Sequence, residues 1–131
     1  RLIRPITIKL FPDVPSDHPA IGSIVLNMAA NMLGLGNAAT PLGLKAMKQL
    51  QSLNKQKDTA TDAMCTFLAI NTSSVQIILP ATVVGLMGAS SSQIFITTIF
   101  ATSLSTVAAI VSVKMLSKMD RFKLDNSEEL T

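Results

Sequence analysis

The chain has little of what most enzymes and nucleic-acid-binding proteins use at their functional sites. Among its 131 residues there is no Trp and no Tyr, one Cys and one His. Cys65 alone cannot form a disulfide within the chain, and His18 has no second histidine or cysteine cluster with which to bind a metal. The net charge of +3 comes from small basic groups, and no Trp or Tyr can stack on bases. We therefore expect no metal, no cofactor and no nucleic-acid partner.

Carboxylates are also scarce, and all of them lie outside the apolar parts of the chain. A general acid and a general base held together in a dry pocket are therefore not visible, and the sequence predicts a protein that is not an enzyme. The eight carboxylates are Asp13, Asp17, Asp58, Asp62, Asp120, Asp125, Glu128 and Glu129.

The lack of charge is greatest between Ala63 and Val113, where there is no Asp, Glu, Lys, Arg or His. Only 15% of the whole chain is charged and 48% is apolar, whereas a soluble domain usually carries about 25% charge. One membrane crossing takes about 20 apolar residues, so this stretch has room for two. We therefore expect a membrane protein, with a soluble helical bundle as the alternative. The length allows one domain at most, and the start at Arg1 suggests a piece of a longer protein.

Prolines and glycines divide the first half of the chain. Residues 1–18 are expected to hold the end of a preceding helix and a Pro-rich connector. A helix capped by Asp17 is predicted from Pro19 to Leu33, ending at the Gly34 and Gly36 pair. The next helix is predicted to open at Thr40 as N-cap, with Pro41 at its first position.

The apolar second half is predicted to contain a broken helix and a full span. The polar run INTSS, residues 70–74, and then Pro80 interrupt it, which gives helical halves near 59–70 and 75–87. A turn is predicted over 88–93, followed by a span over 94–113. The predicted fold class is an all-α membrane protein: a helical bundle with broken or re-entrant helices and at least one full transmembrane span.

Basic residues flank the uncharged block on both sides, and the turn at 88–93 has none. By the positive-inside rule both flanks are predicted to be cytoplasmic and the turn to face out. Residues 118–131 are predicted to form a basic, then acidic, disordered cytoplasmic tail. The flanking cations are Lys45, Lys48, Lys55 and Lys57 on one side and Lys114, Lys118, Arg121 and Lys123 on the other.

Polar residues inside the apolar segments are the candidate site. Asn27 and Asn31 are four apart and share a helix face, and in hydrocarbon each carboxamide must find a partner. Two interpretations stay open, helix packing and the lining of a polar pathway. Interrupted helices at membrane depth commonly line binding sites, so two breaks facing one another would form a polar pocket. The first break offers Gly34, Gly36, Asn37, Thr40 and Pro41, and the second offers Asn71, Thr72, Ser73 and Ser74.

A further series of hydroxyls runs along the last predicted span at roughly helical spacing. Serine and threonine can return their hydrogen bonds to the preceding helical turn, so packing is favoured over a pathway here. The series is Thr97, Thr98, Thr102, Ser105 and Thr106.

Two segments resemble a known family closely. They read NMAANMLGLGNAATPLGLKAMKQLQSLN, residues 27–54, and ATDAMCTFLAINTSS, residues 60–74. Both are similar to the spore maturation protein A family of endospore-forming bacteria, and the similarity extends over most of the chain. These proteins contain the Gate domain, also called the nucleoside recognition domain, which would here occupy residues 19–117. The motif residues are Asn31, Gly34, Gly36, Asn37, Thr40 and Pro41, then Asn71, Thr72 and Ser73.

The resemblance implies a multi-pass protein of the bacterial cell membrane that acts late in sporulation, when the spore core loses water. It also implies a partner, spore maturation protein B, which carries a related domain. The expected function is to gate or move a small polar solute together with that partner. The alternative is a membrane assembly factor that transports nothing and whose asparagines only bind partner helices.

Overall fold

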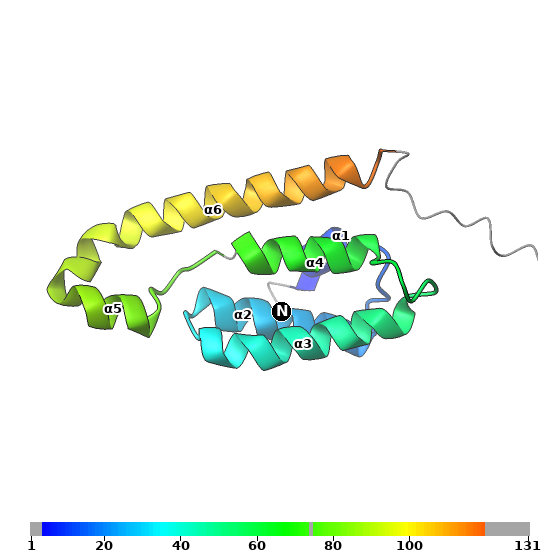
Figure 1. Ribbon diagram of the computed structural model, residues 1–131, viewed down its shortest axis with the longest axis horizontal. Coiled ribbons are helices and arrows are strands. Elements are labelled where there is room, and N and C mark those ends of the chain that lie inside the picture. The colour runs from blue at the N-terminus through cyan, green and yellow to red at the C-terminus, as the bar shows by residue number, and fades with distance from the viewer. Residues whose placement is uncertain (1–3, 74, 120–131) are drawn as a thin grey trace, which may run out of the picture.

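A computed structural model describes residues 4–73 and 75–119, and every element in these ranges is helical (Figure 1). The predicted all-α class is therefore confirmed for this part of the chain. The elements are α1 (Arg4–Leu10), α2 (Pro19–Met32), α3 (Gly36–Leu53), α4 (Asp62–Ser73), α5 (Ala81–Met87), the 3₁₀ turn η1 (Gly88–Ser90) and α6 (Ser91–Leu116).

Helix α2 begins and ends where local signals place it. Pro19 occupies its first turn, as predicted, but the N-cap is His18 and not Asp17. The His18 Nδ1 atom accepts a hydrogen bond of 3.2 Å from the Ala20 backbone N–H, which satisfies one of the free donors of the first turn. At the other end Leu33 is the C-cap, and Gly34 follows with a positive φ of 71°. Glycine suits this left-handed conformation because it has no Cβ.

The predicted start of α3 at Thr40 and Pro41 is wrong. The helix begins at Gly36, and Pro41 lies inside it. Leu35 is the N-cap residue, and its carbonyl accepts hydrogen bonds from the Ala38 and Ala39 N–H groups at 3.0 and 2.9 Å. The Thr40 hydroxyl donates back to the Gly36 carbonyl at 3.3 Å instead of capping a new helix. The break between α2 and α3 is therefore confined to residues 33–35.

The predicted interruption at INTSS is also misplaced. Asn71, Thr72 and Ser73 form the last turn of α4, because the two hydroxyls bond to carbonyls of the preceding turn. Thr72 Oγ1 donates to the Leu68 carbonyl at 2.9 Å and Ser73 Oγ to the Ala69 carbonyl at 2.8 Å. Ser74 lies outside the described residues. The non-helical stretch runs over 75–80 and ends at Pro80, the N-cap of α5.

The non-helical stretch is held between two helices. The N–H groups of Ile77 and Ile78 both donate to the Met32 carbonyl at the end of α2, each at 3.0 Å. On the other side, the Gln76 N–H donates to Thr102 Oγ1 of α6 at 3.3 Å. Residues 75–80 are therefore hydrogen-bonded to the end of α2 on one side and to the middle of α6 on the other.

The buried core lies among α1 to α4, where α2 and α3 form an antiparallel pair (Figure 1). Its fully buried side chains include Phe11, Ile24, Leu50 and Phe67. Burying such side chains stabilises a fold by about 1.5–3 kcal/mol each. This core holds α2 and α4, whose asparagines form the candidate site, against α3.

Helix α6 differs from this core because it is apolar yet almost wholly exposed. Thr106 is its one buried residue among those described. The continuous stretch Thr82–Leu116 is long and apolar enough to cross a membrane, and it contains the predicted span over 94–113. At 26 residues α6 extends about 39 Å, which exceeds the roughly 30 Å hydrocarbon core of a bilayer. Large side chains such as Ile96, Phe100 and Leu104 are more than 60% exposed, as a lipid-facing helix requires.

Helix α6 runs beside α4, and the molecule has two distinct ends (Figure 1). The turn after α3 and the C-terminal end of α6 lie at one end, and η1 lies at the other. Lys55 and Lys57 lie in the turn after α3, Lys114 in the last turn of α6 and Lys118 just beyond it, while η1 and residues 75–87 carry no charge.

Candidate functional site: an asparagine cluster beside an apolar cavity

Three asparagines from two helices meet in one cluster. Asn27 and Asn31 lie one helical turn apart on α2, and Asn71 lies in the last turn of α4. Asn31 Nδ2 donates to Asn71 Oδ1 at 2.5 Å and makes a longer contact of 3.5 Å with Asn27 Oδ1. The buried Asn27 Nδ2 donates to the Ala39 carbonyl of α3 at 2.7 Å. The cluster therefore joins α2, α3 and α4, and it confirms that Asn27 and Asn31 share a face.

Sequence reasoning missed Gly43, which lies directly against this cluster. A Cβ atom at position 43 would lie 3.0 Å from Asn27 Nδ2 and 3.2 Å from Asn71 Nδ2. An alanine at this position would be tight against both amides, and each side chain would have to shift by a few tenths of an ångström. Glycine in the middle of a helix costs roughly 0.5–1 kcal/mol relative to alanine. Its presence inside the predicted helix was therefore the signal in the sequence that another side chain or backbone packs closely there.

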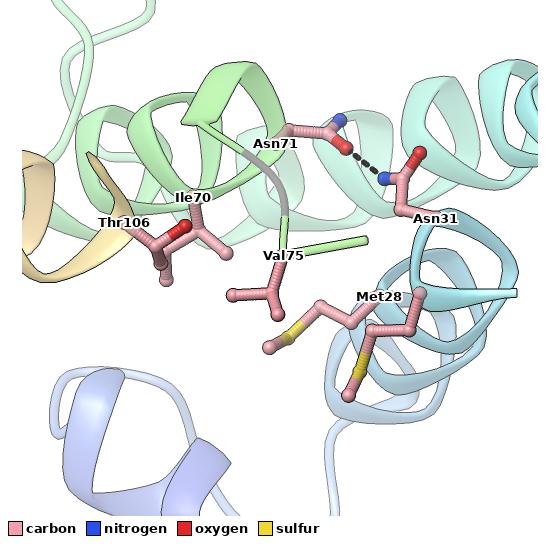
Figure 2. A pocket seen from close by; sticks show the side chains of 7 residues that line it. Met28, Asn31, Ile70, Asn71, Val75 and Thr106 are labelled. Carbon is pink, nitrogen blue, oxygen red and sulfur yellow. Dashed lines mark hydrogen bonds between the residues drawn. The ribbon is translucent and has the colours of Figure 1, made fainter. Parts of the chain in front are cut away.

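A cavity of about 140 Å³ lies beside the cluster, between α2, α4 and α6. In Figure 2 the Asn31–Asn71 hydrogen bond lies on one side of the cavity and the Met28 side chain on the other, with Val75 between them. The predicted polar pocket is therefore wrong in its chemistry, because most of the wall is apolar. The residues that line it are Met28, Asn31, Met32, Ile70, Asn71, Val75 and Thr106.

Each of the two cavity asparagines keeps one unused polar atom. Asn31 Oδ1 and Asn71 Nδ2 make no hydrogen bond to any of the residues in 4–73 and 75–119. One is an acceptor and the other a donor, but both point away from the apolar side chains of the cavity, and Asn71 Nδ2 lies against Gly43 of α3 (Figure 2). No charged side chain lines the cavity. The cavity therefore offers apolar contacts and no ionic contact.

Thr106, at the far wall, uses its hydroxyl for packing. Its Oγ1 lies 2.9 Å from the Thr102 carbonyl and 3.2 Å from the Ser73 carbonyl of α4. Together with the bond from Gln76 to Thr102, this fixes α6 against α4 and the stretch after it. For Thr102 and Thr106 the predicted packing role is confirmed.

The other predicted site residues lie away from the cluster. Asn37, Thr40, Pro41 and Thr72 are exposed, and Gly36 has open space around it. Gly34 has a structural role: a Cβ there would lie 2.8 Å from the Ile78 carbonyl oxygen. Ser73 is half-buried and its hydroxyl stays within α4. The two motif segments thus contribute Asn27, Asn31 and Asn71 to one site, while Ser74 lies outside the described residues.

Acidic, histidine and cysteine side chains do not gather anywhere in the part of the chain that the structure describes. No group of three of them could hold a metal ion there. Cys65 is exposed on α4.

Comparison with known proteins gives one informative relative. The chain is 50% identical over 115 residues to spore maturation protein A of Bacillus subtilis (strain 168), which is 85% of this chain. The chain belongs to the spore maturation protein A family. It spans 58% of the length of that relative. No family profile matches the chain, and no solved structure matches it. The resemblance of the two motif segments is therefore confirmed at the level of the family.

Proposed function

We propose that this chain is the membrane-embedded part of a spore maturation protein in which the Asn31–Asn71 pair gates the passage of a small polar solute. The protein acts in the cell membrane of an endospore-forming bacterium, during dehydration of the spore core. It is multi-pass, with α4, residues 75–80 and α5 as a broken or re-entrant leg of a Gate domain and α6 as a full span. Spore maturation protein B is its partner.

The observation that carries the proposal is the hydrogen bond between Asn31 and Asn71 in the wall of the cavity. A neutral hydrogen bond contributes only about 0.5–1.5 kcal/mol net, so this bond can open without unfolding the surrounding helices. When this bond opens, each carboxamide loses its partner and can form a hydrogen bond with a passing solute instead. A gate needs this combination of a closed resting state and low opening cost.

The assembly-factor alternative rests on a different observation. The Asn27 bond to the Ala39 carbonyl and the Gly43 contact hold α2 and α3 together, which is a packing role. If the chain is an assembly factor, the hydrogen bond between Asn31 and Asn71 serves only to hold α4 against α2.

The test compares Asn71→Leu with Asn37→Leu in the full-length protein, reconstituted with protein B in liposomes. Asn71 contacts Asn31 across the cavity wall, whereas Asn37 is exposed and matched in size and chemistry. Uptake of three radiolabelled probes is measured: a nucleoside, an amino acid and a divalent cation. We expect uptake of one probe to fall at least tenfold in Asn71→Leu and to stay unchanged in Asn37→Leu, with the complex with protein B intact in both.

A double variant separates a lost gate from a lost fold. Asn71→Leu alone leaves Asn31 without its partner, whereas Asn31→Leu with Asn71→Leu removes both polar groups and is better tolerated. If the double variant forms the complex and no probe ever crosses with the unaltered protein, gating is wrong and the assembly role is supported.

A further inference from the structure

We infer that the hairpin of α2 and α3 enters the bilayer only halfway, from the basic side, and that the leucines at its tip contact lipid acyl chains. The tip is residues 33–36, which join the end of α2 to the start of α3. The inference goes beyond the proposed function but rests on one part of it, the crossing of the membrane by α6. It depends on the depth of the tip, the length of the two legs and the surface that the tip exposes.

Hydrogen bonds place the tip at the level of the middle of α6. The N–H groups of residues 77–78 donate to the Met32 carbonyl, and the neighbouring Gln76 N–H donates to Thr102 Oγ1. By the rise of a helix, Thr102 is about 17 Å from the first residue of α6 and about 18 Å from Lys114. Half of the hydrocarbon core of a bilayer is about 15 Å thick, so Thr102 lies near the midplane. Figure 1 likewise shows the tip beside the middle of α6.

Neither leg of the hairpin is long enough to cross the bilayer. Helix α2 has 14 residues and extends about 21 Å, and the uncharged start of α3, residues 36–44, extends about 14 Å. There is no Asp, Glu, Lys or Arg from residue 18 to residue 44, and Lys45 and Lys48 then follow on α3. A leg of about 14 Å that starts at the headgroups ends near the middle of a core about 30 Å thick. The chain must therefore leave the bilayer on the side by which it entered.

The open end of the hairpin lies with the basic end of α6. The turn after α3, with Lys55 and Lys57, is at the same end of the molecule as Lys114 (Figure 1). Charged side chains are rare at the centre of a bilayer because they lose their hydration there. The lysines therefore mark the headgroup level on one side, and the hairpin enters from that side.

The surface of the tip suits acyl chains. Leu33 and Leu35 are about half exposed, and so are Ile77 and Ile78 of the stretch that packs against the tip. In water such a patch would be unfavourable, whereas acyl chains offer it apolar contacts. Asn37 is the exposed amide nearest to them, and we assign the lipid contact to the leucines and isoleucines alone.

The backbone of the tip is also satisfied in the way that contact with lipid requires. The N–H groups of Leu33, Gly34 and Leu35 donate to carbonyls in the last turns of α2, at 3.0, 3.0 and 2.9 Å. The Met32 carbonyl in turn accepts from the stretch after α4. Irregular backbone is tolerated at membrane depth only where its polar groups find partners in the protein. The break between α2 and α3 therefore does not prevent the tip from lying among acyl chains.

The experiment measures the depth of single labelled positions in the full-length protein, reconstituted in liposomes. A bimane fluorophore is attached to single cysteines in a background without native cysteines, Cys65 included. The labelled changes are Leu35→Cys at the tip, Leu44→Cys and Ser52→Cys farther along α3, and Leu104→Cys as the reference on α6, all at exposed side chains. Three quenchers are compared: a phospholipid with a nitroxide near its headgroup, one with a nitroxide near the end of its acyl chain, and iodide in the water.

We expect the nitroxide near the end of the chain to quench the Leu35→Cys label about twofold more than the nitroxide near the headgroup, as at Leu104→Cys. The preference should reverse at Leu44→Cys, which lies closer to the headgroups. Iodide should quench the Ser52→Cys label most. Leu33→Cys is a second exposed position at the tip and should give the same result as Leu35→Cys.

Two results at the tip would overturn the inference. Iodide quenching at Leu35→Cys as strong as at Ser52→Cys would mean that the hairpin lies on the membrane surface. Resistance of both tip labels to iodide and to both lipids would mean that protein, such as a second copy of this chain, covers the tip.

The proposed function fails separately. A tip at mid-depth without uptake of any solute would leave the insertion standing, and uptake that depends on Asn71 with a hairpin on the surface would leave the gate standing. A Leu104→Cys label outside the hydrocarbon would reject the crossing by α6 and the insertion with it.

Discussion

Gly34 and Gly36 stand two positions apart in the same short break, but the structure gives them different roles. Gly34 has a φ of 71°, and a Cβ there would meet the Ile78 carbonyl oxygen at 2.8 Å and the Leu79 carbonyl oxygen at 3.2 Å. Gly36 has no atom within 4 Å of its Cβ position. Gly34 therefore determines how closely residues 75–80 approach the end of α2.

Gly34→Ala tests this role against the matched change Gly36→Ala. We expect Gly34→Ala to lower the free energy of unfolding by about 1–3 kcal/mol, because the left-handed backbone is strained for alanine and the new methyl group contacts backbone that cannot rotate away. Gly36→Ala should leave stability unchanged or slightly higher. Thermal unfolding of the detergent-purified protein measures both. Equal effects of the two substitutions would show that the close approach at Gly34 is unimportant.

At the scale of single helices, the start of α2 depends on an unusual cap. His18 Nδ1 accepts from the Ala20 N–H, a bond more often made by Asn, Asp, Ser or Thr. Because α2 carries both Asn27 and Asn31, its position affects the whole cluster. The helix is otherwise apolar and relies on this cap and on packing for its orientation.

Replacing His18 by Ala should lower the free energy of unfolding by about 1 kcal/mol, the usual cost of losing an N-cap acceptor. His18→Asn should restore most of that stability, because asparagine caps well. Thermal unfolding of His18→Ala, His18→Asn and the unaltered protein makes the comparison. If His18→Asn is as destabilised as His18→Ala, the imidazole contributes by packing and the capping account is wrong.

Helix bounds were predictable where local chemistry decides them. Pro19 and Gly34 place α2 almost to the residue, because a helix accepts proline in its first turn and commonly ends before a left-handed glycine. The Thr40–Pro41 pair gave a wrong start for α3, because a threonine followed by proline is typical of the beginning of a helix. Six residues from Gly36 to Pro41 form the first turns of α3 instead, and its first donors find the Leu35 carbonyl.

The meeting of Asn31 with Asn71 was only partly predictable. Spacing placed Asn27 and Asn31 on one face, and two polar segments facing one another were expected. The apolar character of the cavity depends on Met28, Met32 and Val75, whose directions are set by tertiary packing. The role of Gly43 also requires knowing that α4 crosses α3 there. Periodicity along one helix contains none of this information.

At the scale of the whole molecule, the lysines of α6 and of the turn after α3 lie at the same end. The turn after α3 and the C-terminal end of α6 lie at this end of the molecule, and the sequence gives both of them lysines (Figure 1). The opposite end, around η1, has serines and Gln93 but no charge. An apolar α6 between a basic end and a neutral end is the arrangement that the positive-inside rule associates with a membrane span.

This arrangement predicts the sidedness of three positions. Single cysteines are introduced at Ser52, Ser90 and Ser117 in a Cys65→Ser background, because Cys65 is itself exposed and would react. A membrane-impermeant maleimide is then applied to intact and to permeabilised cells. The positive-inside rule predicts that η1 faces out. We therefore expect Ser90→Cys to react in intact cells, and Ser52→Cys and Ser117→Cys to react only after permeabilisation. Reaction of Ser90→Cys and Ser117→Cys from the same side would mean that α6 does not cross the bilayer. Protection of Ser117→Cys together with outward exposure of Ser52→Cys would leave α6 as a span but contradict the second crossing by α4 and α5.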